Sequence, residues 1–321
     1  MHTDSIGLWI GFGIIILVFL ILDLGVFHRK PHAVTTKEAA IWTVVWISLA
    51  LVFNLAIYYL RGPETALEYL TGYIIEKSLS IDNLFVFVVL FSSFGIAAAQ
   101  QHRVLFWGIL GALVMRGLLI ASGTILIERF FWIVYVFGVF LIFTGIKIGI
   151  KKGSEPHPER NPVLRLARRF LPITNENEGG KFYVRRTGKL FFTPLFLVLI
   201  TIETTDLVFA LDSIPAIFAV TTDPFVIFTS NIFAILGLRS LYFLLANTIG
   251  KFYYLQTALA LILVFVGIKM VLAHFYKVPI AVSLAVVVGL LISAIIASLI
   301  QLRLNKDVEK LKIIPEDENG E

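Results

Sequence analysis

The feature that most constrains the fold of this chain is a series of long apolar runs separated by short polar segments. A helix needs about 20 apolar residues to cross the roughly 30 Å hydrocarbon layer of a membrane. Backbone polar groups in lipid must pair within their own segment, and no run alternates as the strands of a barrel would. The nine runs are Ile6–Phe27, Ala40–Leu60, Tyr69–Phe91, Val104–Ile127, Phe130–Ile150, Leu190–Val220, Phe225–Ala246, Tyr253–Phe275 and Val278–Ile300. We therefore expect an all-α polytopic membrane protein with about nine transmembrane helices.

Composition supports this expectation and excludes other classes of protein. The chain is 58% hydrophobic and 15% charged, and its mean hydropathy is +0.89, whereas soluble domains are about 25% charged. The absence of cysteine excludes disulfides, thiolate metal sites and thiol redox pairs. The net charge is +5, but the basic residues lie between apolar runs, where they set topology. We therefore expect the protein to lie in a lipid bilayer and not to bind nucleic acid.

The distribution of lysine and arginine predicts the orientation. Across nine spans, nineteen of the 27 basic residues fall on one side and three fall on the other, namely Arg61, Arg129 and Lys277. The positive-inside rule then places the N-terminus outside and the C-terminus in the cytoplasm, in the plasma or inner membrane. The predicted parts are N-terminal extra helices (1–68), a first repeat (69–150), a cytoplasmic linker (151–189), a second repeat (190–276), a final span (277–300) and a cytoplasmic tail (301–321). Basic residues of the linker near the spans would meet anionic lipid.

Two similar motifs in the sequence indicate an internal repeat. "EKSLSIDNLFV" starts at Glu76 and "DLVFALDSIPA" starts at Asp206, and each reads acidic residue, five residues, aspartate. One span after each motif comes a mid-span arginine, Arg116 or Arg239, and one span further comes "GIK". Chance similarity of short apolar segments is the alternative. If the repeat is real, its odd number of helices inverts the second copy, as in transporters with a midplane site.

Six acidic residues lie inside the apolar runs, where each charge costs roughly 2.5 to 3.5 kcal/mol at the bilayer centre. They are Asp23, Glu76, Asp82, Glu203, Asp206 and Asp212. One interpretation is structural ion pairs with buried cations such as Arg116 and Arg239. The other is an oxygen-lined cation site, because Asn83 and Ser213 directly follow two of the aspartates. Both interpretations stay open.

The available side chains limit the chemistry of such a site. No cysteine is present and we place no histidine in mid-span, so the ligands would be oxygens, which suit magnesium, calcium and manganese. Serines beside carboxylates lack the histidine base that would activate them as nucleophiles, so we expect that the protein is not an enzyme. We also expect no permanently bound cofactor.

Pro215 predicts an interruption in the sixth run. At about 100° per residue, Asp206 and Asp212 lie about 120° apart on a straight helix and would not converge. Proline supplies no amide to the carbonyl of Leu211, and the run is longer than a straight span requires. We expect a break near Asp212 to Pro215, with a simple proline kink as the alternative.

At these residues the chain resembles the TerC family of integral membrane proteins, over about Leu17 to Leu299 and closest to its Alx branch. The resemblance implies manganese export, and the family name comes from an association with tellurium resistance. The family's essential intramembrane acids correspond to five positions of this chain: Glu76, Asp82, Glu203, Asp206 and Asp212. Asp23 matches an acid of the Alx branch and lies outside the repeat.

The sequence thus predicts a transporter that exports Mn²⁺ through an acidic midplane site. Asp82 and Asp212 would be inner ligands, Asn83 and Ser213 neutral ligands, and the other acids would complete the charge or carry protons. Proton antiport is the simplest coupling. The alternative is a membrane scaffold for secreted or stress-related proteins, in which the acids form ion pairs with Arg116 and Arg239.

Overall fold

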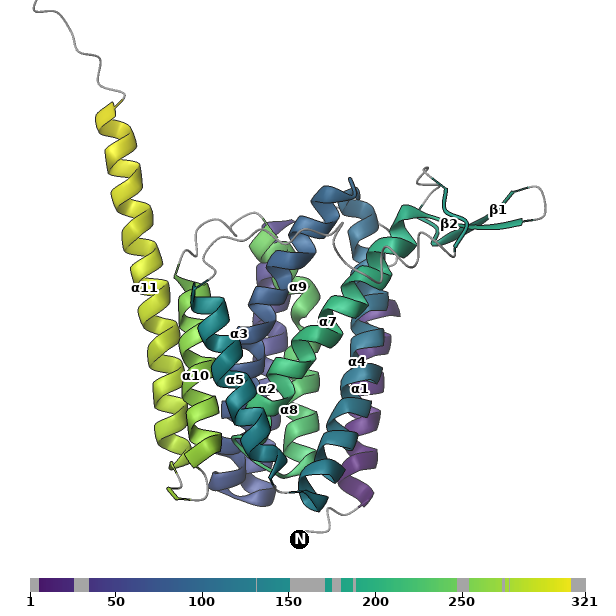
Figure 1. The fold of residues 1–321 in the computed structure, drawn as a ribbon. Coiled ribbons are helices and arrows are strands. Elements are labelled where there is room, and N and C mark those ends of the chain that lie inside the picture. Colours follow the sequence, from purple (N-terminus) through teal and green to yellow (C-terminus); the bar gives the residue numbers. More distant parts are fainter. Residues whose placement is uncertain are drawn as a thin grey trace, which may run out of the picture.

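A computed structural model of the chain describes residues 6–25, 35–130, 132–150, 171–174, 180–186, 189–246, 254–272, 275–276 and 278–312. It is a helix bundle with a small pair of strands projecting from one end (Figure 1). The helices are α1 (Ile6–Gly25), α2 (Thr36–Arg61), α3 (Pro63–Ser93), α4 (Ala98–Arg129), α5 (Ile133–Ile150), α7 (Pro194–Phe218), α8 (Pro224–Leu236), α9 (Leu238–Ala246), α10 (Leu255–Leu272) and α11 (Ile280–Lys312). The strands are β1 (Tyr183–Arg186) and β2 (Lys189–Phe192).

The helices fit a protein that crosses a membrane several times. Each of the nine predicted ranges contains a helix, or the pair α8 and α9 in the seventh. In the described part of the chain, six helices are long and apolar enough to span a membrane, and the bent pair α8–α9 makes a seventh. In Figure 1, α1 begins at the lower end of the bundle and α11 ends beyond the upper end. An all-α polytopic membrane protein is therefore confirmed, whereas the count of nine spans stays a prediction.

Buried apolar side chains form three clusters that define depth in the bundle. The first cluster lies where α4 and α7 end, with Ile120 and Ile217, and the second lies where the same helices begin, with Leu105 and Val198. The third cluster packs α1 and α2 against α3 and α8. Each helix that passes from the first cluster to the second therefore crosses the middle of the bundle.

Corresponding helices of the two predicted repeats run in opposite directions and touch. From N- to C-terminus, α3 leads from the first cluster to the second, and α7 leads from the second to the first. The same opposition holds for α4 and the α8–α9 pair, and α3 contacts α7, α4 contacts α8, and α5 contacts α10. Gly138 and Gly267 let α5 and α10 approach closely, because a Cβ on Gly267 would lie 2.6 Å from the Gly138 carbonyl oxygen.

The predicted break in the sixth span is wrong. α7 runs without interruption from Pro194 to Phe218 with Pro215 inside it, so the loss of one backbone hydrogen bond is tolerated near the helix end. The start of the predicted run, from Leu190 to Phe192, is part of strand β2. The run looked too long for one helix because it contains a strand and a helix.

The broken span is the next one instead. α8 and α9 meet at Gly237 with a bend of 40°. A Cβ at Gly237 would lie 2.8 Å from Nζ of Lys77 and 3.1 Å from Cβ of Trp46, so a larger residue would require these two side chains to shift. The Lys77 ammonium donates to the carbonyl of Ala234 at 3.1 Å, because carbonyls in the last turn of a helix lack an intrahelical partner.

Candidate functional site in the centre of the bundle

A buried ion triad joins the two predicted repeats. Arg116 on α4 donates from Nε and Nη2 to the two carboxylate oxygens of Asp206 on α7, at 3.1 and 2.9 Å. Its Nη1 donates to Oε1 of Glu76 on α3. The exposed fractions are 0% for Glu76, 1% for Arg116 and 4% for Asp206. One guanidinium thus serves two carboxylates, and the triad carries a formal charge of −1.

The triad lies at mid-depth. Asp206 is the middle residue of α7, and Glu76 and Arg116 lie close to the middle of α3 and α4. On α7 it is flanked by Ile202 of the second hydrophobic cluster and Ala210 of the first. The charges are therefore enclosed by apolar layers on both sides, where a guanidinium with bidentate geometry is the most effective partner.

Glu203 lies one helical turn before Asp206 and faces α4. A Cβ placed on Gly111 would come within 2.1 Å of Oε1 of Glu203, so the carboxyl group packs directly against the backbone of α4. Residues three apart share a helix face, which brings Glu203 beside the triad. Gly111 is a position that sequence reasoning missed, since glycine in an apolar run gives no sign of what it faces.

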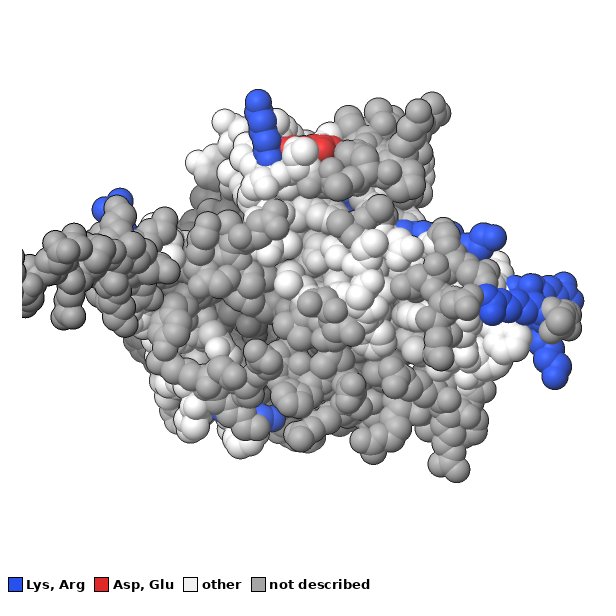
Figure 2. Space-filling view, turned by 90° about the horizontal axis from the view of Figure 1, so that it is seen from above, with Lys and Arg blue, Asp and Glu red and all other residues white. Residues whose placement is uncertain are grey.

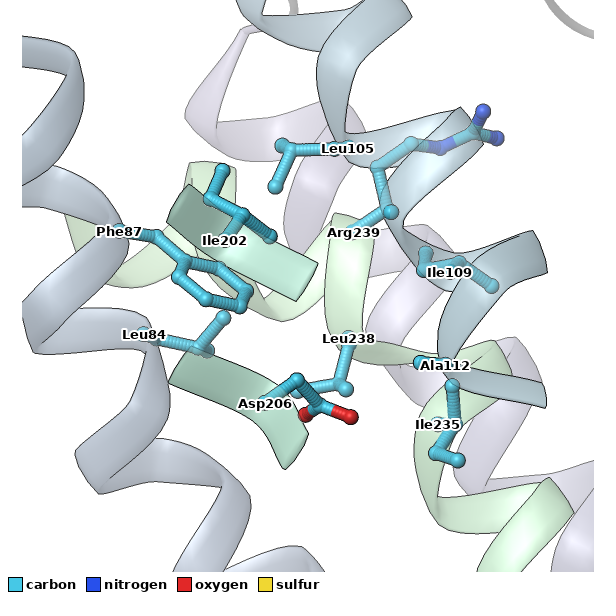
Figure 3. Close-up of a pocket in the computed structure, with 11 residues that line it drawn as sticks. Leu84, Phe87, Leu105, Ile109, Ala112, Ile202, Asp206, Ile235, Leu238 and Arg239 are labelled. Carbon is cyan, nitrogen blue, oxygen red and sulfur yellow. The ribbon is translucent and has the colours of Figure 1, made fainter. Parts of the chain in front are cut away.

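A small cavity opens beside the triad on the side of the second cluster. Its volume is about 20 Å³, and Asp206 and Arg239 line it among mostly apolar side chains such as Phe87 and Leu238. Figure 3 shows the Asp206 carboxylate within this ring and the guanidinium of Arg239 turned away from it. A volume of about 20 Å³ has room for one water-sized particle, and the Asp206 carboxylate is the polar group in a wall that is otherwise mostly apolar.

Several buried polar atoms on α3, α7 and α8 make no hydrogen bond to another described residue. They are Oε2 of Glu76, Oγ of Ser80, Oγ of Ser213, and both Nδ2 and Oδ1 of Asn231. Leaving such a group unpaired costs about 1 to 3 kcal/mol. Natural proteins keep few unpaired groups of this kind, and each one is a candidate for a ligand contact.

Asn231 is the most conspicuous of these and was not selected from the sequence. It lies on α8 and is 0% exposed. Contacts of two nearby residues of α8 show its depth. Ser230 packs against Gly72 of α3, and the backbone carbonyl of Ala234 accepts a hydrogen bond from Lys77 of α3. Asn231 therefore lies at the level of the segment of α3 that contains Glu76. An amide inside the apolar run "FTSNIFAIL" was the signal that could have identified it.

The structure brings together some of the predicted site residues. Glu76, Asp206 and Arg116 are in direct contact, and Asn83 and Ser213 are buried, 3% and 2% exposed. The side chains of Asp23, Asp82 and Asp212 lie outside the described part, although their backbones lie in α1, α3 and α7. Among the described side chains, no three His, Asp or Glu residues are grouped so that they could hold a metal ion. The pairing with Arg116 is the arrangement that the ion-pair interpretation expects for Glu76 and Asp206.

Comparison with known proteins gives the family. The sequence profile of the "Integral membrane protein TerC family" matches residues 61–306. The chain belongs to the TerC family. The match covers both acidic motifs, both mid-span arginines and the broken span. No solved structure matches the chain.

Related proteins align with nearly the whole length of this chain. An uncharacterized membrane protein of Myxococcus xanthus is 54% identical over 94% of each chain. The "Putative membrane-bound redox modulator Alx" of Escherichia coli (strain K12) is 50% identical, over 90% of this chain and 93% of the relative. A membrane protein of Rickettsia felis is 46% identical, over 91% and 97%. The predicted relation to the Alx branch is confirmed.

Proposed function

We propose that this TerC family protein exports Mn²⁺ from the cytoplasm through the acidic centre of its helix bundle. The observation that supports this most is the charge of the triad, since Arg116 is shared between Glu76 and Asp206. A formal charge of −1 enclosed by apolar layers attracts a cation, and carboxylate, amide and hydroxyl oxygens suit a hard dication. An ion pair with a purely structural role would need only one carboxylate for the guanidinium of Arg116.

The proposal includes two inverted three-helix repeats, α3–α5 and α7–α10. Opposite directions and mutual contact of the corresponding helices support it. The shared guanidinium supports it as well, because Glu76 comes from the first unit and Asp206 from the second. In transporters of this kind the site lies at the interface of the repeats and access alternates by movement of one unit against the other.

Arg116 acts in this proposal as an internal cation that the substrate displaces. Mn²⁺ would reach Asp206 through the small cavity, which lies on the side of the triad nearer the end where α4 and α7 begin. The predicted topology makes this end cytoplasmic. Asp82 and Asp212 remain the proposed inner ligands, and Asn83, Ser213 and Asn231 the neutral ligands, with Glu203 beside the path.

Export of a dication against an interior-negative potential needs a source of energy. The cost is about 2.3 kcal/mol per charge for each 100 mV, hence about 4.6 kcal/mol for Mn²⁺. Carboxylates that release a proton when the ion binds provide the simplest coupling, so we propose proton antiport.

Purified protein in liposomes tests the proposal directly. Mn²⁺ flux should appear without any partner protein and should stop in Asp82→Asn and Asp212→Asn, because a neutral amide binds a hard dication more weakly than an anionic oxygen. The matched control is Glu64→Gln, which removes an exposed acid from the first turn of α3. Normal flux in both aspartate variants, or flux restored by adding Arg116→Gln or Arg239→Gln, would contradict the ligand assignment.

A second function is supported by the name of some of the relatives, the Alx proteins. They are described as a membrane-bound redox modulator, and a scaffold for secreted or stress-related proteins would use the triad only as a structural ion pair. Any redox role of this chain would have to work without its own thiols, since it contains no cysteine. Absence of Mn²⁺ flux from well-folded protein in liposomes would favour this alternative.

A further inference from the structure

The strand pair β1–β2 forms a basic projection at one end of the bundle. The segment from Lys181 to Phe192 contains four basic residues and no acid. β1 and β2 pair antiparallel, with Arg185 opposite Leu190. Figure 1 shows the strands extending sideways from the bundle, away from the helices, and Figure 2 shows lysine and arginine gathered at this edge.

The projection is fastened to two membrane helices. Thr193, the residue between β2 and α7, is 0% exposed and donates from Oγ1 to the carbonyl of Lys181 at 2.7 Å. Arg103, near the start of α4, donates to the carbonyl of Gly180 at 2.9 Å and lies over the ring of Phe182 at 5.3 Å. The strands are therefore held at the depth where α4 and α7 leave the apolar layer.

Between the strands and α4 lies a hollow of about 680 Å³. Arg103, Lys181 and Arg185 line it, and no carboxylate is among the described residues of its wall. Tyr183 and Leu190, 61% and 45% exposed, form its apolar part. Guanidinium groups suit phosphate oxygens, and exposed aromatic side chains are frequent at the membrane interface.

We propose that this hollow binds the headgroup of an anionic phospholipid, with its phosphate on Arg103, Lys181 and Arg185 and its glycerol and upper acyl chain on Tyr183 and Leu190. Free phosphate shares the charge, but it would make no use of the two exposed apolar side chains. The strands project sideways from the start of α7 (Figure 1), so the hollow lies at the edge of the bundle beside α4, where lipid would surround the helices. This lipid site does not depend on the proposed cation transport. It gives the C-terminal end of the predicted linker (151–189) a binding partner in the membrane.

Lipid retention by the full-length protein tests this site. The protein is purified in detergent with equal amounts of phosphatidylglycerol and phosphatidylcholine, and retained lipid is counted by native mass spectrometry. Wild type should retain phosphatidylglycerol selectively. Lys181→Gln/Arg185→Gln should weaken this retention more than tenfold, and it leaves the contact between Arg103 and Gly180 in place, so the hollow keeps its shape.

The control is Arg186→Gln/Lys189→Gln, which removes the same charge from strand residues that lie outside the wall of the hollow. It should retain phosphatidylglycerol like wild type. Equal losses in the two double variants would mean general attraction to basic residues and would overturn the site. Equal retention of both lipids, or release of phosphatidylglycerol by millimolar inorganic phosphate, would overturn it too, the latter in favour of a free phosphate site.

Discussion

Replacing Arg116 should destabilise the protein more than replacing either of its acidic partners. Arg116→Gln leaves two carboxylates close together and buried, and breaking a buried pair in this way costs about 3 to 5 kcal/mol. Glu76→Gln and Asp206→Asn each leave the arginine with one carboxylate. They lose charge-assisted hydrogen bonds worth about 1.5 to 3 kcal/mol. The expected order of stability is wild type, then either acid variant, then Arg116→Gln.

The free energy of unfolding, measured by denaturant titration of detergent-solubilised protein, gives this order. Arg129→Gln at the exposed end of α4 is the control and should change the stability by less than about 1 kcal/mol. The triple variant Glu76→Gln/Arg116→Gln/Asp206→Asn should recover most of the loss, since no buried charge is left alone. If Arg116→Gln were as stable as the control, or the triple variant as unstable as Arg116→Gln, the shared ion triad would be refuted.

Three further predictions follow from single positions. Asn231→Leu should raise the free energy of unfolding by about 1 kcal/mol or more, because it removes an unpaired buried amide, and should lower Mn²⁺ flux in liposomes; unchanged flux would exclude Asn231 from the transport path. Gly237→Ala should lower stability by about 1 to 3 kcal/mol, since the added Cβ crowds Lys77 at the break between α8 and α9, and an increase in melting temperature would contradict this. Gly267→Ala should cost at least as much, because its Cβ would meet backbone of α5, whereas Gly289→Ala, with nothing within 4 Å, should be neutral or stabilising.

The length of the apolar runs and the low content of charged residues were enough to predict the class of fold. Each apolar run contains a helix because lipid leaves the backbone no other partner than itself. The family followed from the two acidic motifs, which are long and unusual for an apolar chain. The arginines at 116 and 239 were recognised as possible partners of the acids, since a charge within a span requires one.

The sequence could not say where a helix breaks. Pro215 was the obvious candidate, yet α7 continues through it, and the bend lies at Gly237, where α3 and α2 press Lys77 and Trp46 against the backbone. Proline removes one hydrogen bond of its own helix, whereas the need for glycine arises from side chains more than 150 residues away. Only packing reveals the second kind of requirement.

The sequence by itself determined which residues are too polar for lipid and therefore must have partners. The tertiary structure decided which partners they have. Arg116 pairs with both Glu76 and Asp206, and Lys77 donates to the carbonyl of Ala234. The side-chain amide of Asn231 makes no hydrogen bond to a described residue. The physical reason is that the cost of burying a charge depends on the residue, while its compensation depends on directions and distances between helices. Those are fixed by the packing of the whole bundle.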